Sequence, residues 1–196
     1  MLLSVGQLLG HSGNNIFSVL VGSNVVEISR EQLNIWINLQ VKETEDEAKL
    51  ACGYRCNCLE VGHHHHKEGW EDRIVELSQL GLVVDTKQDM EKVVGLTVSR
   101  QGVGRACTSE SALINSTLGE VELFNEEYYT WLMCTAGKTI GEIVKDMKHM
   151  LQGKIEEKYD KREKGEFTEV EYSKAVREEV LQIVKKLTSL NLVVLG

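Results

Sequence analysis

The stretch "IVELSQLGLVV" (74–84) is the most informative about the fold, because it returns near the end of the chain as "VKKLTSLNLVV" (184–194). The residues that match at a constant offset of 110 are Leu77 with Leu187, Leu80 with Leu190, Leu82 with Leu192, Val83 with Val193 and Val84 with Val194. Helically spaced leucines followed by a β-rich run predict, in both places, a helix that leads directly into a strand. Gly81 and Asn191 suit the left-handed position that ends such a helix.

A second match lies upstream and extends the similarity between the two halves. "VEISREQLNIW" (26–36) aligns with "VELFNEEYYTW" (121–131) at an offset of 95, and the same register pairs "TEDE" (44–47) with "TIGE" (139–142). Because both matches occur in the same order, they predict a duplicated unit. The difference between the offsets places extra residues in the second copy, in the charged stretch 154–169, which we expect to form a solvated helical extension.

Each copy carries the same local signals in the same order. The predicted hairpins are Ile16–Val21 with Val25–Ile28 and Ala112–Ser116 with Glu120–Phe124. A helix follows each hairpin, starting from the capping box of Ser29 and Gln32 in the first copy and from Asn125 in the second. Thr44 and Thr139 head two further capping boxes, and a last helix ends each copy. Trp36 and Trp131 occupy equivalent positions and are expected to be core residues.

This order predicts an α+β chain of two tandem winged-helix-like domains, 1–95 and 96–196. Each would contain a β-hairpin, three helices and a closing strand or wing. In the first copy, we expect Lys87–Glu91 to turn strand 82–84 back onto 93–99 as a wing.

The second copy resembles the PqqD-like winged-helix modules. The residues that carry the resemblance are Val121, Leu123, Trp131, Lys138-Thr139-Ile140, Glu142-Ile143-Val144 and Leu187–Val194, and the first half resembles the family as a diverged duplicate. Members of that family are non-catalytic and bind peptides, often by adding a strand to the edge of the hairpin. The resemblance therefore implies a peptide- or protein-binding role.

Composition narrows the function classes further. The net charge is −8, which argues against general affinity for nucleic acid, since phosphate binding requires clustered Lys and Arg. No run approaches the ~20 apolar residues that a membrane helix needs, and the first residues lack the features of a signal peptide. Five cysteines without a regular framework fit reduced thiols, so we expect a cytoplasmic protein without a membrane partner.

The segment "ACGYRCNCLEVGHHHHKEG" (51–69) has the composition of a metal site. The candidate ligands are Cys52, Cys56, Cys58, His63, His64, His65 and His66, which offer the sulfur and nitrogen atoms that Zn²⁺ prefers. Their spacing matches no recognised structural zinc pattern. The alternative is a histidine-rich connection between two helices, with Cys52 as a small core residue, and the sequence favours this second interpretation.

The remaining candidates for chemistry are sparse. Ser99–Arg105 has two glycines and two arginines but lacks the spacing of a phosphate-binding loop, so we interpret it as a turn between domains. No constellation of catalytic residues is apparent. The sequence therefore predicts a non-enzymatic peptide- or protein-binding adaptor. The alternative is a DNA-binding transcriptional regulator that could respond to metal through the Cys/His cluster, which the acidic residues of helix 68–80 disfavour.

Overall fold

The structure is a computed structural model that describes residues 1–54, 68–108, 111–135, 137–160 and 168–196. It contains two compact units, Met1–Val93 with Val194–Gly196, and Val94–Val193. The last three residues, which the sequence division placed in the second half, belong to the first unit, where the Gly6 N–H donates to the Leu195 carbonyl at 2.7 Å.

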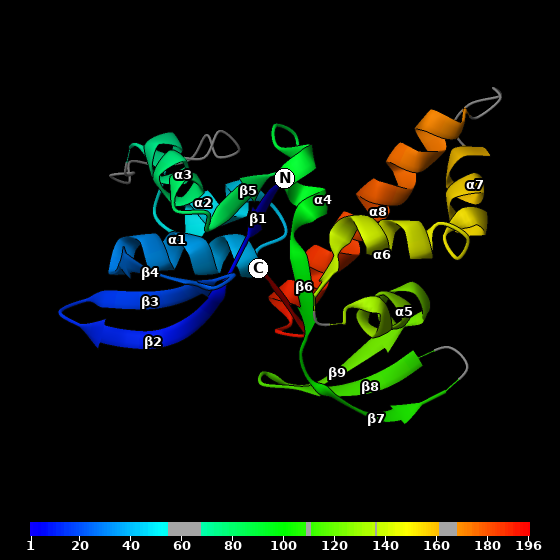
Figure 1. Cartoon of the computed structure of the whole chain (residues 1–196), viewed down its shortest axis with the longest axis horizontal. Coiled ribbons are helices and arrows are strands. Elements are labelled where there is room, and N and C mark those ends of the chain that lie inside the picture. The colour runs from blue at the N-terminus through cyan, green and yellow to red at the C-terminus, as the bar shows by residue number, and fades with distance from the viewer. Residues whose placement is uncertain (55–67, 109–110, 136, 161–167) are drawn as a thin grey trace. The chain divides into compact units, whose positions relative to one another are not determined.

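The first unit is a three-stranded antiparallel meander followed by helices (Figure 1). Its elements are β1 (Leu2–Ser4), β2 (Gln7–Gly13), β3 (Ile16–Val21), β4 (Asn24–Ser29), α1 (Arg30–Val41), α2 (Glu45–Ala51), α3 (Trp70–Gln79) and β5 (Val83–Asp85). α4 (Met90–Gly95) follows and leads into the second unit. α1 packs on β3 and β4, with Val19, Ile28 and Trp36 in the core between helix and sheet.

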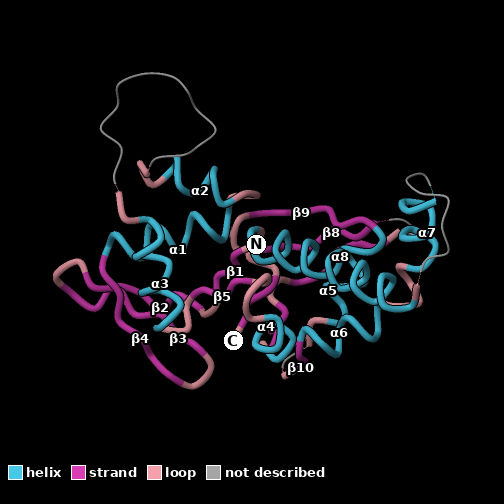
Figure 2. Tube along the Cα trace, turned by 90° about the horizontal axis from the view of Figure 1, so that it is seen from above, coloured by secondary structure: helices cyan, strands magenta, loops and turns pink. Residues whose placement is uncertain are grey.

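The second unit repeats this plan with additions. Its elements are β6 (Thr97–Arg100), β7 (Val103–Cys107), β8 (Ser111–Ser116), β9 (Gly119–Phe124), α5 (Asn125–Met133), β10 (Lys138–Thr139), α6 (Ile140–Met147), α7 (Gln152–Asp160) and α8 (Glu169–Ser189). β11 (Val193–Leu195) begins at the last residue of this unit, and its other two residues belong to the first unit. The strands order as β7-β8-β9 and as β10-β6-β11. α8 packs against α5 and α6, as Figure 2 shows. The mixed α+β class is therefore confirmed.

The local predictions hold where the signals are short-range. Both hairpins form, with β3 paired to β4 and β8 paired to β9 in unbroken registers. The capping boxes headed by Ser29, Thr44 and Thr139 form. In each, the hydroxyl of the cap residue accepts from the backbone N–H three residues on, and the Gln or Glu side chain at that position accepts from the backbone N–H of the cap residue. α5 begins at Asn125 as expected, although without a side-chain cap. Gly81 and Asn191 have positive φ angles of 75° and 53°, as predicted for the ends of their helices.

The predicted wing of the first copy is wrong. β5 pairs with β1 instead, in a register that places Leu3 opposite Val84, and Met90–Gly95 forms the helix α4. The reason is that Leu2 and Leu3 supply a fully buried strand, which no local sequence pattern predicted. The stretch after β5 is drawn into a helix because the Asp89 and Val93 amides donate to carbonyls four residues back.

Each unit contains a hydrogen bond from a tryptophan at the equivalent position, and this correspondence supports the duplication. The Trp36 indole N–H donates to the Val5 carbonyl at 3.0 Å, and that of Trp131 donates to the Gln101 carbonyl at 2.9 Å. Both tryptophans are core residues as predicted, only 3% and 4% exposed. β1 pairs with β5 as β6 pairs with β11. The winged-helix assignment itself stays a prediction.

The charged insertion of the second copy is partly docked. α7 packs on α8 and buries Ile155, while Leu151 just before it is also buried. Residues 161–167 of the expected extension lie outside the described residues. Among the helices that the structure describes, none combines the length and the apolar composition required to cross a bilayer.

Candidate functional site

The outer edge of β4 is a regular strand edge. The register between β3 and β4 runs without a shift from Ile16 opposite Ser29 to Val21 opposite Asn24. On the other side of the sheet, the pairing of β2 with β3 shifts twice, at Leu8/Gly10 and at His11/Gly13. Bulges disrupt the hydrogen-bond ladder and protect an edge from further pairing. Of the two edges of this sheet, β4 is therefore the one suited to an additional strand.

The direction of the outer backbone groups of β4 follows from the hairpin. The two-residue turn makes Val21 and Asn24 a hydrogen-bonded pair, and such pairs alternate along an antiparallel ladder. Val25 and Glu27 are consequently in non-hydrogen-bonded pairs with β3, and their N–H and C=O groups point outward. In the described part of the chain, no strand pairs with this side of β4.

The second unit repeats this edge. β9 pairs with β8 in an unbroken register from Ser111 opposite Phe124 to Ser116 opposite Gly119, whereas the pairing of β7 with β8 shifts between Gly104 and Ala106. By the same alternation, Glu120 and Glu122 present their backbone groups outward. Both units therefore have one shifted edge and one regular edge, in the same positions.

In the first unit, α3 contacts the start of α1, and the residues after α3 approach the end of β3. Near the start of α1, the Gln32 side-chain amide donates to Glu76 of α3 at 3.3 Å, and Arg73 of α3 lies 3.6 Å from Glu31. After the end of α3, a side chain at Gly81 would lie 3.7 Å from Val21. α3 is therefore held against the start of α1 and approaches the end of β3. Leu80, directly after α3, is 37% exposed, and Val25 of β4 is 58% exposed.

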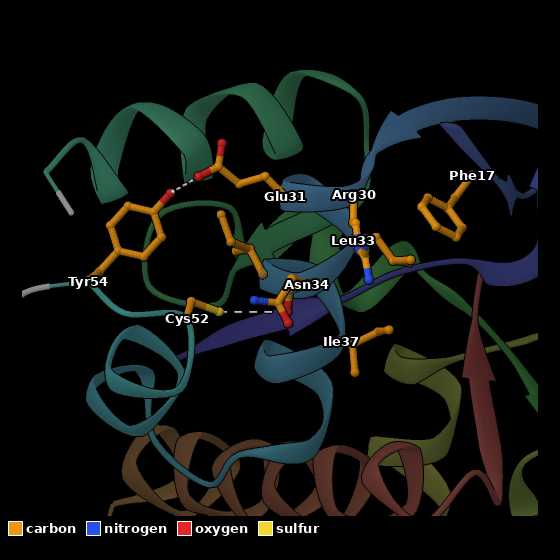
Figure 3. A pocket seen from close by; sticks show the side chains of 9 residues that line it. Phe17, Arg30, Glu31, Leu33, Asn34, Ile37, Cys52 and Tyr54 are labelled. Carbon is orange, nitrogen blue, oxygen red and sulfur yellow. Dashed lines mark hydrogen bonds between the residues drawn. The ribbon is translucent and has the colours of Figure 1, made fainter. Parts of the chain in front are cut away.

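A pocket of about 610 Å³ lies along α1 (Figure 3). Its walls include the apolar Phe17, Leu33 and Ile37 and the polar Arg30, Asn34 and Tyr54. Figure 3 shows Tyr54 and Cys52 at one end and Phe17, from β3, at the other. Pockets of this size hold small molecules or one or two peptide side chains.

The charges around this pocket are unevenly paired. The Tyr54 hydroxyl donates to Glu31 at 3.2 Å, and Arg73 lies between Glu31 and Glu76. Burial, and then the negative charge of Glu31, raise the pKa of Tyr54, so the phenol stays protonated and remains a donor. Arg30 is exposed and has no ion-pair or hydrogen-bond partner among the residues that the structure describes. Arg30 is therefore the unneutralised cation of this pocket.

Of the predicted metal ligands, only Cys52 can be placed. It is a buried core residue at the end of α2, and its thiol donates to the Asn34 carbonyl at 3.7 Å. The equivalent position in the second unit, 95 residues on, is the fully buried Met147. The other candidates, Cys56, Cys58 and His63–His66, lie outside the described residues. Within the described ranges, no three His, Cys, Asp or Glu side chains are grouped to hold a metal ion.

The segment that carries the other candidates lies between two buried aromatic residues of the sequence. Tyr54 and Trp70, which precede and follow residues 55–67, are almost fully buried, and their rings meet edge to face at 5.2 Å. The Trp70 indole donates to Glu45 at 2.9 Å. Tyr54 and Trp70 are therefore held together by an aromatic contact in the core of the first unit.

The other sequence candidates have structural roles. Ser99–Arg105 comprises the end of β6, a turn and the start of β7, and the Arg100 guanidinium lies over the Trp131 ring at 4.7 Å. Cys134 is fully buried, and this burial raises its thiol pKa to about 12, which leaves it unreactive at neutral pH.

Comparison with known proteins gives no family. No protein-family model matches the chain, and no curated protein or solved structure matches it significantly. Its function has to be inferred from the residues and geometry of the chain itself.

Sequence reasoning missed the groups that shape this site. It assigned neither β1 nor β2, so it found neither the shifted edge nor the pocket. The pocket brings together β3, α1 and the residues after α2, which are up to 37 positions apart between Phe17 and Tyr54. A cue was present in "Arg30-x-x-Leu33-x-x-x-Ile37", whose spacing puts a cation and two apolar residues on one face of a helix.

Proposed function

We propose that the chain is a non-enzymatic adaptor that binds an extended peptide segment of a partner protein by strand addition. The observation that supports this best is the unbroken, outward-facing backbone edge of β4, repeated at β9. Strand addition uses main-chain hydrogen bonds for affinity and neighbouring side chains for specificity. The resemblance to the PqqD-like winged-helix modules implies the same mode of binding.

The surroundings of β4 favour a peptide that carries apolar residues. Val25 is 58% exposed on the face of the sheet opposite the buried Val19, and a segment lying along β4 would cover part of it. Burial of such side chains stabilises a complex by about 25 cal/mol per Å² of apolar surface removed from water. A purely polar partner would leave this gain unused.

The charges of α3 argue against the alternative of a DNA-binding regulator. A winged-helix recognition helix reads DNA with unpaired basic side chains. α3, which the structure describes in full, carries Glu71, Asp72 and Glu76 against Arg73. Arg73 is already bonded to Glu76 at 2.7 Å and lies 3.6 Å from Glu31. The cation of α3 is thus engaged by carboxylates, and the acidic residues of the helix repel a phosphate group.

The test uses peptides selected from a random dodecamer display library against the whole chain. Glu27→Pro removes one outward N–H without touching a bond to β3, and proline is tolerated on the solvent side of an edge strand. Glu27→Ala is the matched control, since it removes the same side chain and keeps the amide. We expect binding to weaken about tenfold in Glu27→Pro only, because a hydrogen bond is lost and the ring obstructs the added strand.

Amide hydrogen exchange identifies the binding mode directly. On saturation with a selected peptide, the amides of Val25 and Glu27 should become protected, and Glu120→Pro against Glu120→Ala reports the same for β9. Equal affinity of Glu27→Pro and Glu27→Ala, with no new protection at either edge, would exclude strand addition. Sequence-specific binding of duplex DNA at physiological salt would favour the regulator instead.

A further inference from the structure

We propose that the pocket on α1 is a specificity pocket for a carboxylate placed next to an aliphatic side chain, as in a Glu-Leu or Asp-Leu pair of the bound partner. This inference rests on the proposed peptide-binding function and assigns the chemistry of the peptide. It concerns side chains of α1, β3 and the residues after α2 rather than the backbone edge of β4, and so it makes a separate contact from the β4 edge.

The core face of the sheet in the first unit is incompletely covered. α1 packs on β3 and β4, whereas Leu8 of β2 lies opposite the buried Val19 and yet remains 41% exposed. Directly paired residues of neighbouring strands share one face of a sheet. Leu8 is therefore an apolar side chain on the core face that the described helices leave open. Ile37 of α1, which lines the pocket together with Phe17 and Leu33, is likewise 36% exposed.

The polar part of the pocket is the guanidinium of Arg30, which lies on the same face of α1 as the apolar lining residues. Arg30, Leu33 and Ile37 lie three and four positions apart, so they share one face of α1 and all line the pocket. Figure 3 shows the Arg30 side chain beside Leu33, with Phe17 across from both. The nearby Glu31 is occupied by Tyr54 and Arg73. A guanidinium that no carboxylate of the described residues neutralises, next to an apolar wall, is complementary to an anionic group on an aliphatic segment.

The second unit provides an internal comparison. At the offset of 95, Asn125 stands in place of Arg30 and Ala112 in place of Phe17. Tyr128 replaces Leu33, stacks on Trp131 with ring centres 6.1 Å apart, and is hydrogen bonded by Cys107, which raises its pKa. An amide and an aromatic ring thus replace the cation and the aliphatic wall. The carboxylate pocket is a property of the first unit alone among the described parts of the two copies.

The experiment uses NMR titration of the ¹⁵N-labelled whole chain with three capped dipeptides. The probes are N-acetyl-glutamyl-leucyl-N-methylamide and its analogues with glutamine or lysine in place of glutamate, which are too short to form a strand ladder. We expect the glutamyl probe to shift the amides of Phe17, Leu33 and Ile37. The glutaminyl probe should bind about three- to tenfold more weakly, and the lysyl probe more weakly still, as expected for one partly exposed charge pair.

Arg30→Gln should remove the preference for glutamyl over glutaminyl, and Arg30→Lys should retain part of it. Arg105→Gln, at an exposed arginine of β7, is the matched control and should change nothing. Equal binding of the glutamyl and glutaminyl probes to the wild-type chain, shifts centred elsewhere, or no shifts at all would each overturn the inference. Glu27→Pro leaves the dipeptide titration unaffected, so failure of the pocket and failure of strand addition give different results.

Discussion

The indole N–H of Trp36 donates to the backbone carbonyl of Val5 at 3.0 Å, in a place where both residues are almost completely buried. The bond fixes α1 to the residue that follows β1, and so it couples the central helix to the two-stranded sheet of β1 and β5. Trp131 makes the equivalent bond to Gln101. The presence of the same interaction in each unit is the clearest structural correspondence between the two halves of the chain.

Trp36→Phe should destabilise the first unit by about 2–4 kcal/mol, because it leaves a buried carbonyl without a partner and also removes core volume. Circular dichroism during urea unfolding measures the loss. Trp70→Phe is the matched control. It removes a similar buried ring, but the Trp70 indole bonds to Glu45, whose carboxylate is 43% exposed and can be rehydrated. Equal losses in the two variants would show that the Val5 carbonyl contributes nothing specific.

Gly6→Ala and Gly102→Ala should each cost more than about 2 kcal/mol. Both glycines have positive φ angles, 103° and 83°, and an added Cβ would lie 2.8 Å from the Leu20 and Asn115 carbonyl oxygens respectively. Gly22→Ala separates the two causes, since Gly22 has a φ of 58° and an added Cβ there would have no atom of the described residues within 4 Å. It should cost only about 1 kcal/mol. Thermal or urea unfolding measures the loss of stability. A similar loss in all three variants would mean that the chain shifts to relieve the close contact of the added Cβ with the carbonyl oxygen.

Cys52 should behave as a core residue. Cys52→Ala is expected to lower the free energy of unfolding by about 1 kcal/mol, through lost packing in the cluster that includes Trp36 and Leu39. Cys56→Ser and Cys58→Ser should change it by less than about 0.5 kcal/mol if the segment is the histidine-rich connection that the sequence favours. A chelator should leave the melting temperature unchanged. Stoichiometric zinc that survives dialysis, together with a chelator-sensitive melting temperature, would establish the metal site that the composition of 51–69 also allows.

The Thr139 capping box should make the second unit sensitive to acid. Hydrogen bonds from the Thr139 backbone and side chain lower the pKa of Glu142. Because the folded pKa lies below the unfolded value, this stabilisation is present above the ordinary carboxyl pKa of 4.5 and is lost as the pH falls through the folded pKa. NMR titration should show the depressed pKa in the wild-type chain and a return toward the ordinary value in Thr139→Ala. An unchanged pKa in that variant would assign the shift to the backbone N–H of residue 139, which alanine retains, with Lys138 and Lys145 as smaller causes.

Features whose causes lie within a few residues could be predicted from the sequence. The capping boxes at Ser29, Thr44 and Thr139 need partners three positions away, and the hairpins need a short turn between two β-rich runs. The left-handed helix ends at Gly81 and Asn191 were likewise predictable, as were the buried tryptophans. The order of these local signals was sufficient to predict the α+β class, and the duplication that it also predicts is supported by the equivalent hydrogen bonds of Trp36 and Trp131.

The pairing of distant segments, and the surface that stays open, emerged only from the folded chain. Leu2–Ser4 is a three-residue run without alternation, and its partner Val83–Asp85 is some 80 residues away, so no local pattern announces their pairing. The pocket likewise could not be predicted from a local pattern. Phe17, Arg30 and Tyr54 line one pocket only because α1 packs on β3 and α2 packs on α1. Pairing and packing between remote segments depend on competition among all buried surfaces, which one stretch of sequence cannot express.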